Sequence, residues 1–61
     1  MPNLTSKELE VIEEQLSVER TMMKKFKMYS EICSDPQLKQ KCEQIAAMHQ
    51  AHLTTLSDQL G

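Results

Sequence analysis

Residues 33–38 read Cys-Ser-Asp-Pro-Gln-Leu, and this stretch divides the chain into two halves. A proline disfavours helical geometry in the residue before it, so a helix arriving from the N-terminal side must end near Cys33. Asp35 is a favourable N-cap residue and Pro36 suits the first position of a helix, so a second helix should start there. The stretch therefore predicts one bend, at residues 34–35, between two helices.

The segment before the bend carries an apolar stripe at helical spacing. The run Thr5-Ser6-Lys7-Glu8 has the capping-box pattern that starts a helix. Apolar side chains then follow in steps of three, four or seven residues, at Leu9, Ile12, Leu16, Met23, Phe26 and Cys33. This spacing is typical of one long amphipathic helix, which we expect over about residues 5–33 after a short lead-in.

The segment after the bend repeats the pattern. Three or four residues separate the members of its stripe, which are Leu38, Cys42, Ile45, His49, His52 and Leu56. We expect a helix over about residues 36–60, with Gly61 as its stop. Because so short a connection makes neighbouring helices antiparallel, residues 1–61 should form a single all-α domain, an antiparallel helical hairpin.

Length and composition limit what this hairpin can be. The chain has 61 residues, of which 39% are apolar, with one Phe, one Tyr and no Trp to fill a core. A chain this short is marginal alone and usually needs a metal, disulfides or a partner. Since two-fold dimers are the commonest closed assemblies, we expect two hairpins to pair into a homodimeric four-helix bundle.

Charge and hydropathy restrict the partners. The formal net charge is −2 and no broad basic face is present, so we expect no nucleic acid partner. No run approaches the ~20 apolar residues needed to span a bilayer, and no signal peptide is evident, so we expect no membrane and a cytoplasmic location. In a reducing compartment Cys33 and Cys42 would be small buried thiols, and a disulfide within or between chains is the alternative.

Three ionisable side chains interrupt the stripes at one height. Glu19 lies 15.5 residues before the middle of the bend, and His49 and His52 lie 14.5 and 17.5 residues after it. At ~1.5 Å per residue, all three are roughly 22 to 26 Å from the bend. An antiparallel hairpin therefore sets Glu19 opposite both histidines, which share a face through their i, i+3 spacing.

Two interpretations of this layer stay open. Glu19, His49 and His52 can form a polar layer that fixes helix register, or they can be metal ligands. No cofactor is required by the sequence, and a divalent transition metal, zinc or iron, is the candidate. We predict no catalytic residues, because no nucleophile constellation is present and Cys42 lies two turns, about 10 Å, from His49.

The second helix resembles the ligand helix of the ferritin-like and rubrerythrin-like families. Residues 45–52, Ile-Ala-Ala-Met-His-Gln-Ala-His, are similar to the family pattern of an Ile-Ala pair followed by Glu-x-x-His. His52 matches the family histidine, Glu19 matches the lone glutamate of the preceding helix, and Phe26 matches a common aromatic position. His49 stands where the family has a glutamate, so the resemblance lacks one bridging carboxylate of a di-iron centre.

A closer likeness is to the coat F family of spore-forming bacteria. It rests on Ser17-Val18-Glu19, on Asp35-Pro36-Gln37-Leu38 at the bend, and on His49 with His52, over about residues 8–60. The resemblance implies a spore-associated structural or assembly protein without catalytic activity, pairing with itself and with other spore proteins. The alternatives are a metal-binding or redox protein, and an RNA-binding dimer similar in outline to the Rop type, which the acidic composition disfavours.

Overall fold

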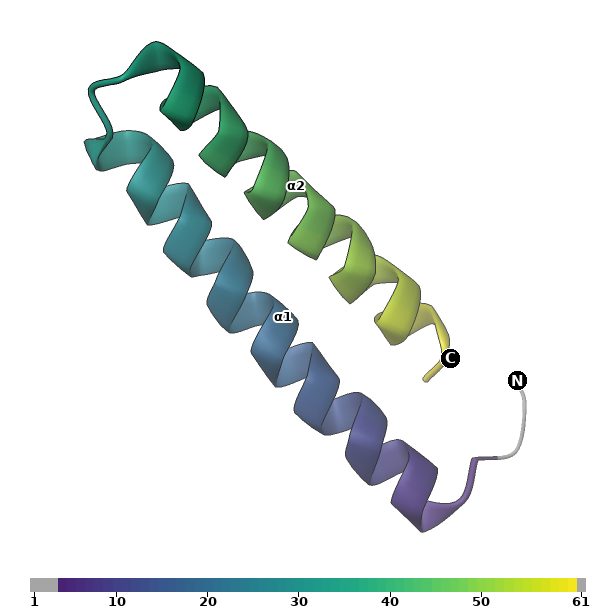
Figure 1. Cartoon of the computed structure of the whole chain (residues 1–61). Helices are drawn as coiled ribbons and strands as arrows, with labels where there is room; N and C mark the ends of the chain where they lie inside the picture. Colours follow the sequence, from purple (N-terminus) through teal and green to yellow (C-terminus); the bar gives the residue numbers. More distant parts are fainter. Residues whose placement is uncertain (1–3, 61) are drawn as a thin grey trace.

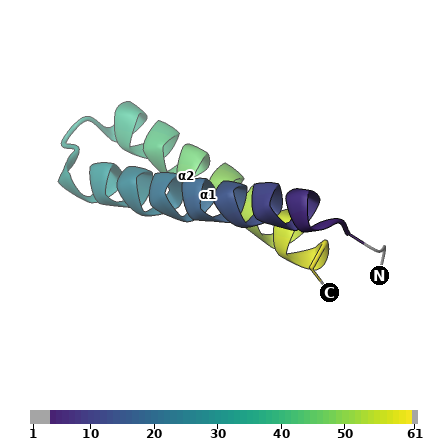
Figure 2. The ribbon, with the colours of Figure 1, turned by 90° about the horizontal axis from the view of Figure 1, so that it is seen from below.

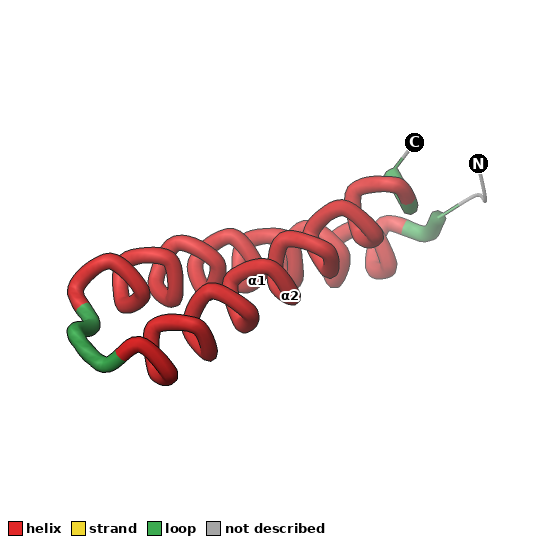
Figure 3. Tube along the Cα trace, turned by 90° about the horizontal axis from the view of Figure 1, so that it is seen from above, coloured by secondary structure: helices red, strands yellow, loops and turns green. Residues whose placement is uncertain are grey.

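The computed structural model describes residues 4–60, which form two antiparallel α-helices (Figure 1). Helix α1 spans Ser6–Ile32 and helix α2 spans Pro36–Asp58. Figure 3 shows the single short connection that joins them at one end. Residues 4–60 contain no strand, so the predicted all-helical hairpin is confirmed, whereas the stop expected at Gly61 lies outside the described residues.

The capping box fixes the start of α1. The Thr5 hydroxyl oxygen accepts the backbone N–H of Glu8 at 3.1 Å, and the Glu8 carboxylate accepts the backbone N–H of Thr5 at 2.9 Å. These two bonds satisfy donors that the first turn of a helix leaves without a partner inside the helix. Thr5 has extended geometry, so the helix proper begins at Ser6, one residue later than the sequence suggests.

The bend forms where the sequence places it. Cys33 has extended geometry as the C-cap of α1, and its N–H donates to the Tyr29 carbonyl at 3.0 Å. The Asp35 side chain then caps α2 by accepting the N–H groups of Gln37 and Leu38 at 2.9 and 3.0 Å. Pro36 has no N–H to satisfy, which suits it to the first position of α2.

Helix α2 ends at Asp58, slightly before the expected boundary at residue 60. The N–H groups of Gln59 and Leu60 donate three residues back, to the carbonyls of Leu56 and Ser57 at 3.1 and 3.0 Å. This tighter pattern is common in the last turn of a helix and accounts for the earlier boundary.

The hairpin buries little apolar surface. Figure 2 shows the two helices crossing at a shallow angle, with no further element packed against them in the described chain. Within residues 4–60 the buried apolar side chains are Leu16 and Cys42, and the buried polar ones are Glu19 and Ser30. The Ser30 hydroxyl donates to the Lys27 carbonyl at 2.6 Å, so it is satisfied by its own helix.

Both cysteines are free thiols in this arrangement. Cys42 is buried between the helices, as expected for a small apolar side chain. Cys33 is half-buried at the bend, where its thiol contacts the Asp35 carbonyl at 3.7 Å. Among the described residues, neither helix is long and apolar enough to cross a lipid bilayer.

Candidate metal centre

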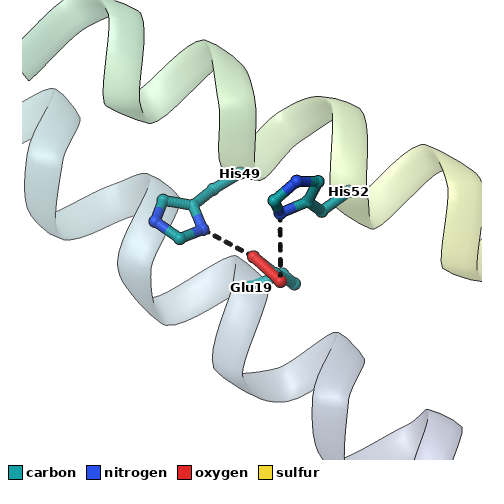
Figure 4. Close-up of side chains that lie close together, drawn as sticks. All are labelled: Glu19, His49 and His52. Carbon is teal, nitrogen blue, oxygen red and sulfur yellow. Dashed lines mark hydrogen bonds and ion pairs between the residues drawn. The ribbon is translucent and has the colours of Figure 1, made fainter.

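A buried carboxylate between two imidazoles forms the centre of the hairpin (Figure 4). Glu19 projects from the middle of α1 with 7% of its side chain exposed. Its Oε1 lies 2.5 Å from Nδ1 of His49, and its Oε2 lies 3.5 Å from Nδ1 of His52. Both histidines come from α2 and turn the same ring nitrogen toward the carboxylate.

The structure brings together the three residues that the sequence places at one height. One ligand atom from each of Glu19, His49 and His52 can be chosen so that all three lie within 4.8 Å of one another. Equal distance from the bend sets the level of Glu19 against the histidines, and the i, i+3 spacing sets both imidazoles on one side of α2. The three side chains therefore lie close enough to hold a metal ion.

A fourth residue, Gln15, supports the carboxylate and was not anticipated from the sequence. Its Nε2 donates to Oε2 of Glu19 at 3.0 Å. Gln15 stands one turn before Glu19 on α1, so the i, i+4 spacing was the signal that could have identified it. Groups of this kind commonly orient the side chains that bind a metal.

Hydrogen bonding lowers the pKa of the Glu19 carboxyl below its ordinary value. The bond from His49 is the largest cause, burial acts in the opposite direction, and the bond from Gln15 and the charges of both histidines assist the lowering. Because an ionised carboxylate only accepts hydrogen bonds, Nδ1 of His49 carries the proton in its bond to Oε1. A metal ion at this point would replace that proton and keep the carboxylate charged.

Aromatic contacts hold His49 in place. The ring of Phe26 stacks on the His49 imidazole, with centroids 6.2 Å apart and planes inclined by 22°. Tyr29 packs edge-on against Phe26 at 5.5 Å, and His52 packs edge-on against His49 at 5.9 Å. Phe26 therefore restricts the rotation of the ring that makes the shorter contact with Glu19.

The two histidines differ in exposure. His49 has 17% of its side chain exposed, whereas His52 has 52%, although both belong to the apolar stripe of α2. In the described hairpin His52 lies half in solvent, because α1 does not cover that side of α2. The prediction that both histidines occupy core positions applies to the four-helix bundle and stays a prediction. The cluster is closed toward the bend, where Phe26 covers it, and open at His52.

The donor set fits a divalent transition metal. Two imidazoles and one carboxylate are the ligand types found in three-ligand zinc sites with an open position and in non-haem iron sites. Gln15 fits the supporting position, because it restrains the carboxylate without displacing either nitrogen. All buried polar side-chain atoms of the described residues have a hydrogen-bond partner, so the same cluster is also satisfied as a polar layer.

Comparisons with protein-family models, with curated proteins and with solved structures find no match for this chain. The resemblance to the coat F and ferritin-like families therefore stays a prediction from the residues.

Proposed function

We propose that the protein binds a divalent transition metal, of the zinc or iron type, between its two helices. The observation that carries this proposal is the buried Glu19 carboxylate, which faces Nδ1 of His49 and Nδ1 of His52. Glu19, His49 and His52 are the ligands, and Gln15 positions the carboxylate. The bound ion would act as a Lewis acid or, if iron, as a redox centre.

The half-exposed position of His52 supports binding rather than a purely structural layer. A polar layer that only fixes register does not need an imidazole half in solvent, whereas a metal site needs a route for the ion. Three protein ligands also leave positions for water or another small ligand. The histidine at position 49, in place of a family-like glutamate, favours one ion per hairpin over a pair bridged by carboxylates.

Isothermal titration of the metal-free protein with Zn²⁺, Co²⁺ and anaerobic Fe²⁺ at pH 7.5 tests this function. We expect one ion per chain and, for Co²⁺, visible absorption that reports imidazole and carboxylate ligation. His52→Ala should weaken binding at least about 100-fold, since loss of even a supporting residue commonly costs 10- to 100-fold. Thr55→Ala, an exposed change one turn along α2, is the matched control and should bind as the wild type does.

Absence of binding by all three ions would leave the polar layer as the role of the cluster. Binding that survives His52→Ala and His49→Ala would place the ion elsewhere. Either result would overturn the metal-binding proposal without affecting the fold.

A second proposal follows from the small core: the protein acts as a homodimeric structural or assembly protein. Leu16 and Cys42 are the buried apolar side chains of the described hairpin, which is little for a chain that must fold in water. Pairing of two hairpins into a four-helix bundle of the ferritin-like type would cover the apolar side chains left exposed. Resemblance to the coat F family suggests the spore coat as the setting and other spore proteins as partners.

Multi-angle light scattering at micromolar concentration tests the dimer, with the mass of two chains expected and the mass of one contradicting it. Immunodetection in coat fractions of purified spores of the encoding organism tests the setting. A signal restricted to the cytoplasm of growing cells would contradict spore association. These two measurements are independent of the metal titration.

A further inference from the structure

The two long edges of the hairpin differ in chemistry. On α1, Val11, Val18 and Ile32 are exposed and lie a multiple of seven residues apart, so they share one side of the helix. Tyr29 and Ile32 line the same hollow as Leu38 of α2, so that side continues across both helices. We define the apolar face as Val11, Val18, Tyr29, Ile32, Leu38 and Met48, all of which are exposed.

The opposite edge is charged. A second hollow between the helices is lined there by Lys27, Glu31, Lys39 and Glu43, together with small side chains of α2. Met48 stands two residues from Ala46 and Gln50, which line this charged side, and helical spacing turns Met48 toward the other edge. One edge is thus charged, whereas the other is mainly apolar, with Lys25 as the basic member of the seven-residue series that holds Val11, Val18 and Ile32.

The hairpin exposes more surface than a typical folded monomeric protein of its mass. Its accessible area is 4690 Å², whereas about 4,000 Å² is typical for 7.0 kDa. Its Cα radius of gyration is 14.3 Å, compared with about 10.5 Å for a compact chain of this length and about 14 Å for one twice as long. The Cα trace measures 46 × 15 × 11 Å, so it is one helix thick.

Charge along α1 indicates how a second copy would lie. Residues 6–18 carry four glutamates, Glu8, Glu10, Glu13 and Glu14, against one lysine, Lys7. Residues 20–32 carry four basic side chains, Arg20, Lys24, Lys25 and Lys27, against one glutamate, Glu31. Antiparallel packing of α1 against the α1 of a second copy sets each acidic half beside a basic half. Parallel packing would set like charges together, which is unfavourable.

We infer that a second copy of this chain covers the apolar face, with the two α1 helices antiparallel and a two-fold axis at the level of residue 19. Full overlap of two helices that span Ser6–Ile32 puts the axis at their midpoint, residue 19. Val18 then lies beside the axis, and Lys25 lies at the level of residue 13 of the other copy, within its acidic half. This arrangement rests on the proposed homodimer and does not depend on the metal.

The same arrangement explains why the cluster is open on one side. His52 lies one turn beyond Met48 on α2, so its exposed half belongs to the edge that the second copy covers. Because Glu19 lies at the level of the axis, the two clusters of a dimer stand at one height, one in each hairpin. Docking therefore covers the exposed half of His52 in both hairpins, so an ion would have to bind before the two copies pair.

Crosslinking of single introduced thiols tests the inference, using full-length chains that carry Cys33→Ser and retain the buried Cys42. A short bis-maleimide should join two copies of the Val18→Cys chain, because both thiols flank the axis. Ser17→Cys is the matched control at the same level on another side of α1, and it should give no covalent dimer. Val11→Cys should give none either, since antiparallel packing separates the two thiols by about 24 Å along the helices at ~1.5 Å per residue.

Together the results distinguish failure of this inference from failure of the dimer on which it rests. A single-chain mass by light scattering would overturn both. A two-chain mass with crosslinking through position 17 instead of 18 would overturn the face, and crosslinking through position 11 would overturn the antiparallel direction. A dimer that crosslinks at none of the three positions would also overturn the inference while leaving the proposed homodimer intact. Far-UV circular dichroism of each variant verifies that the helices are kept.

Discussion

The smallest change with the largest expected effect on the hairpin is Leu16→Ala. Leu16 is 5% exposed, and it is the large aliphatic side chain that α1 and α2 bury together within residues 4–60. Truncating a buried leucine costs about 2.7 to 5 kcal/mol, from lost transfer free energy and the cavity left behind. The total free energy of unfolding of a 61-residue chain is roughly 3 to 9 kcal/mol, at about 0.05 to 0.15 kcal/mol per residue. The substitution should therefore remove about 30% or more of the free energy of unfolding.

Circular dichroism at 222 nm during urea and thermal unfolding measures this loss. At about 4 to 8 °C per kcal/mol for a small domain, Tm should fall by at least about 11 °C. Ile32→Ala is the control: Ile32 is 73% exposed in the single hairpin, so at concentrations where one chain predominates it should cost no more than about 0.5 kcal/mol. A cost below about 1 kcal/mol for Leu16→Ala would refute the reasoning, because the helices would then be held by something other than this contact.

Three further outcomes are expected. Zinc at 100 times its dissociation constant adds about 2.7 kcal/mol to stability, so Tm should rise by about 11 to 22 °C in scanning fluorimetry. His49→Ala should abolish that rise, and an equal rise in the variant would contradict the site. In metal-free protein the lowered pKa values of Glu19, bonded by His49, and Glu8, bonded by the Thr5 backbone, stabilise the fold above pH 4.5. This contribution should fade as pH falls from 4.5 toward the folded-state values, and urea unfolding that shows higher stability at pH 3 than at pH 6 would contradict it. Thr5→Ala should cost about 1 kcal/mol and speed amide exchange in the first turn of α1, and a similar effect of Ser6→Ala would show that capping is not the cause.

Local signals in the sequence were sufficient to predict the helices and their join. Thr5 and Glu8 satisfy each other as the capping-box spacing requires, and Asp35 with Pro36 starts α2 where the chemistry of capping places it. The level of Glu19 against the histidines also follows from counting residues along two helices of equal rise. The caps depend on residues that are close in sequence, and the level of Glu19 depends on the number of residues between each side chain and the bend.

The environment of the cluster could not be predicted in the same way. The stripe of α2 predicts that His49 and His52 share one side of the helix. The rotation of α2 about its own axis decides which of the two histidines contacts α1 more closely. The structure turns His49 onto Phe26 and leaves His52 half in solvent. The bond from Gln15 depends on a side-chain conformation that spacing allows but does not require.

Both ends of the described hairpin lie together, since Leu4 and Gln59 line one hollow. In the proposed antiparallel dimer the second copy would have its ends at the far end of the bundle. Fusing two copies in tandem would therefore need a linker along the 46 Å length of the hairpin, or at least about 14 extended residues at ~3.3 Å each. With a linker of four residues, the two copies within one polypeptide could not pack their apolar faces together in the antiparallel direction. Each copy would instead pair with a copy in a second polypeptide. The shortest linker that allows pairing within one polypeptide therefore reports whether the two copies pack antiparallel.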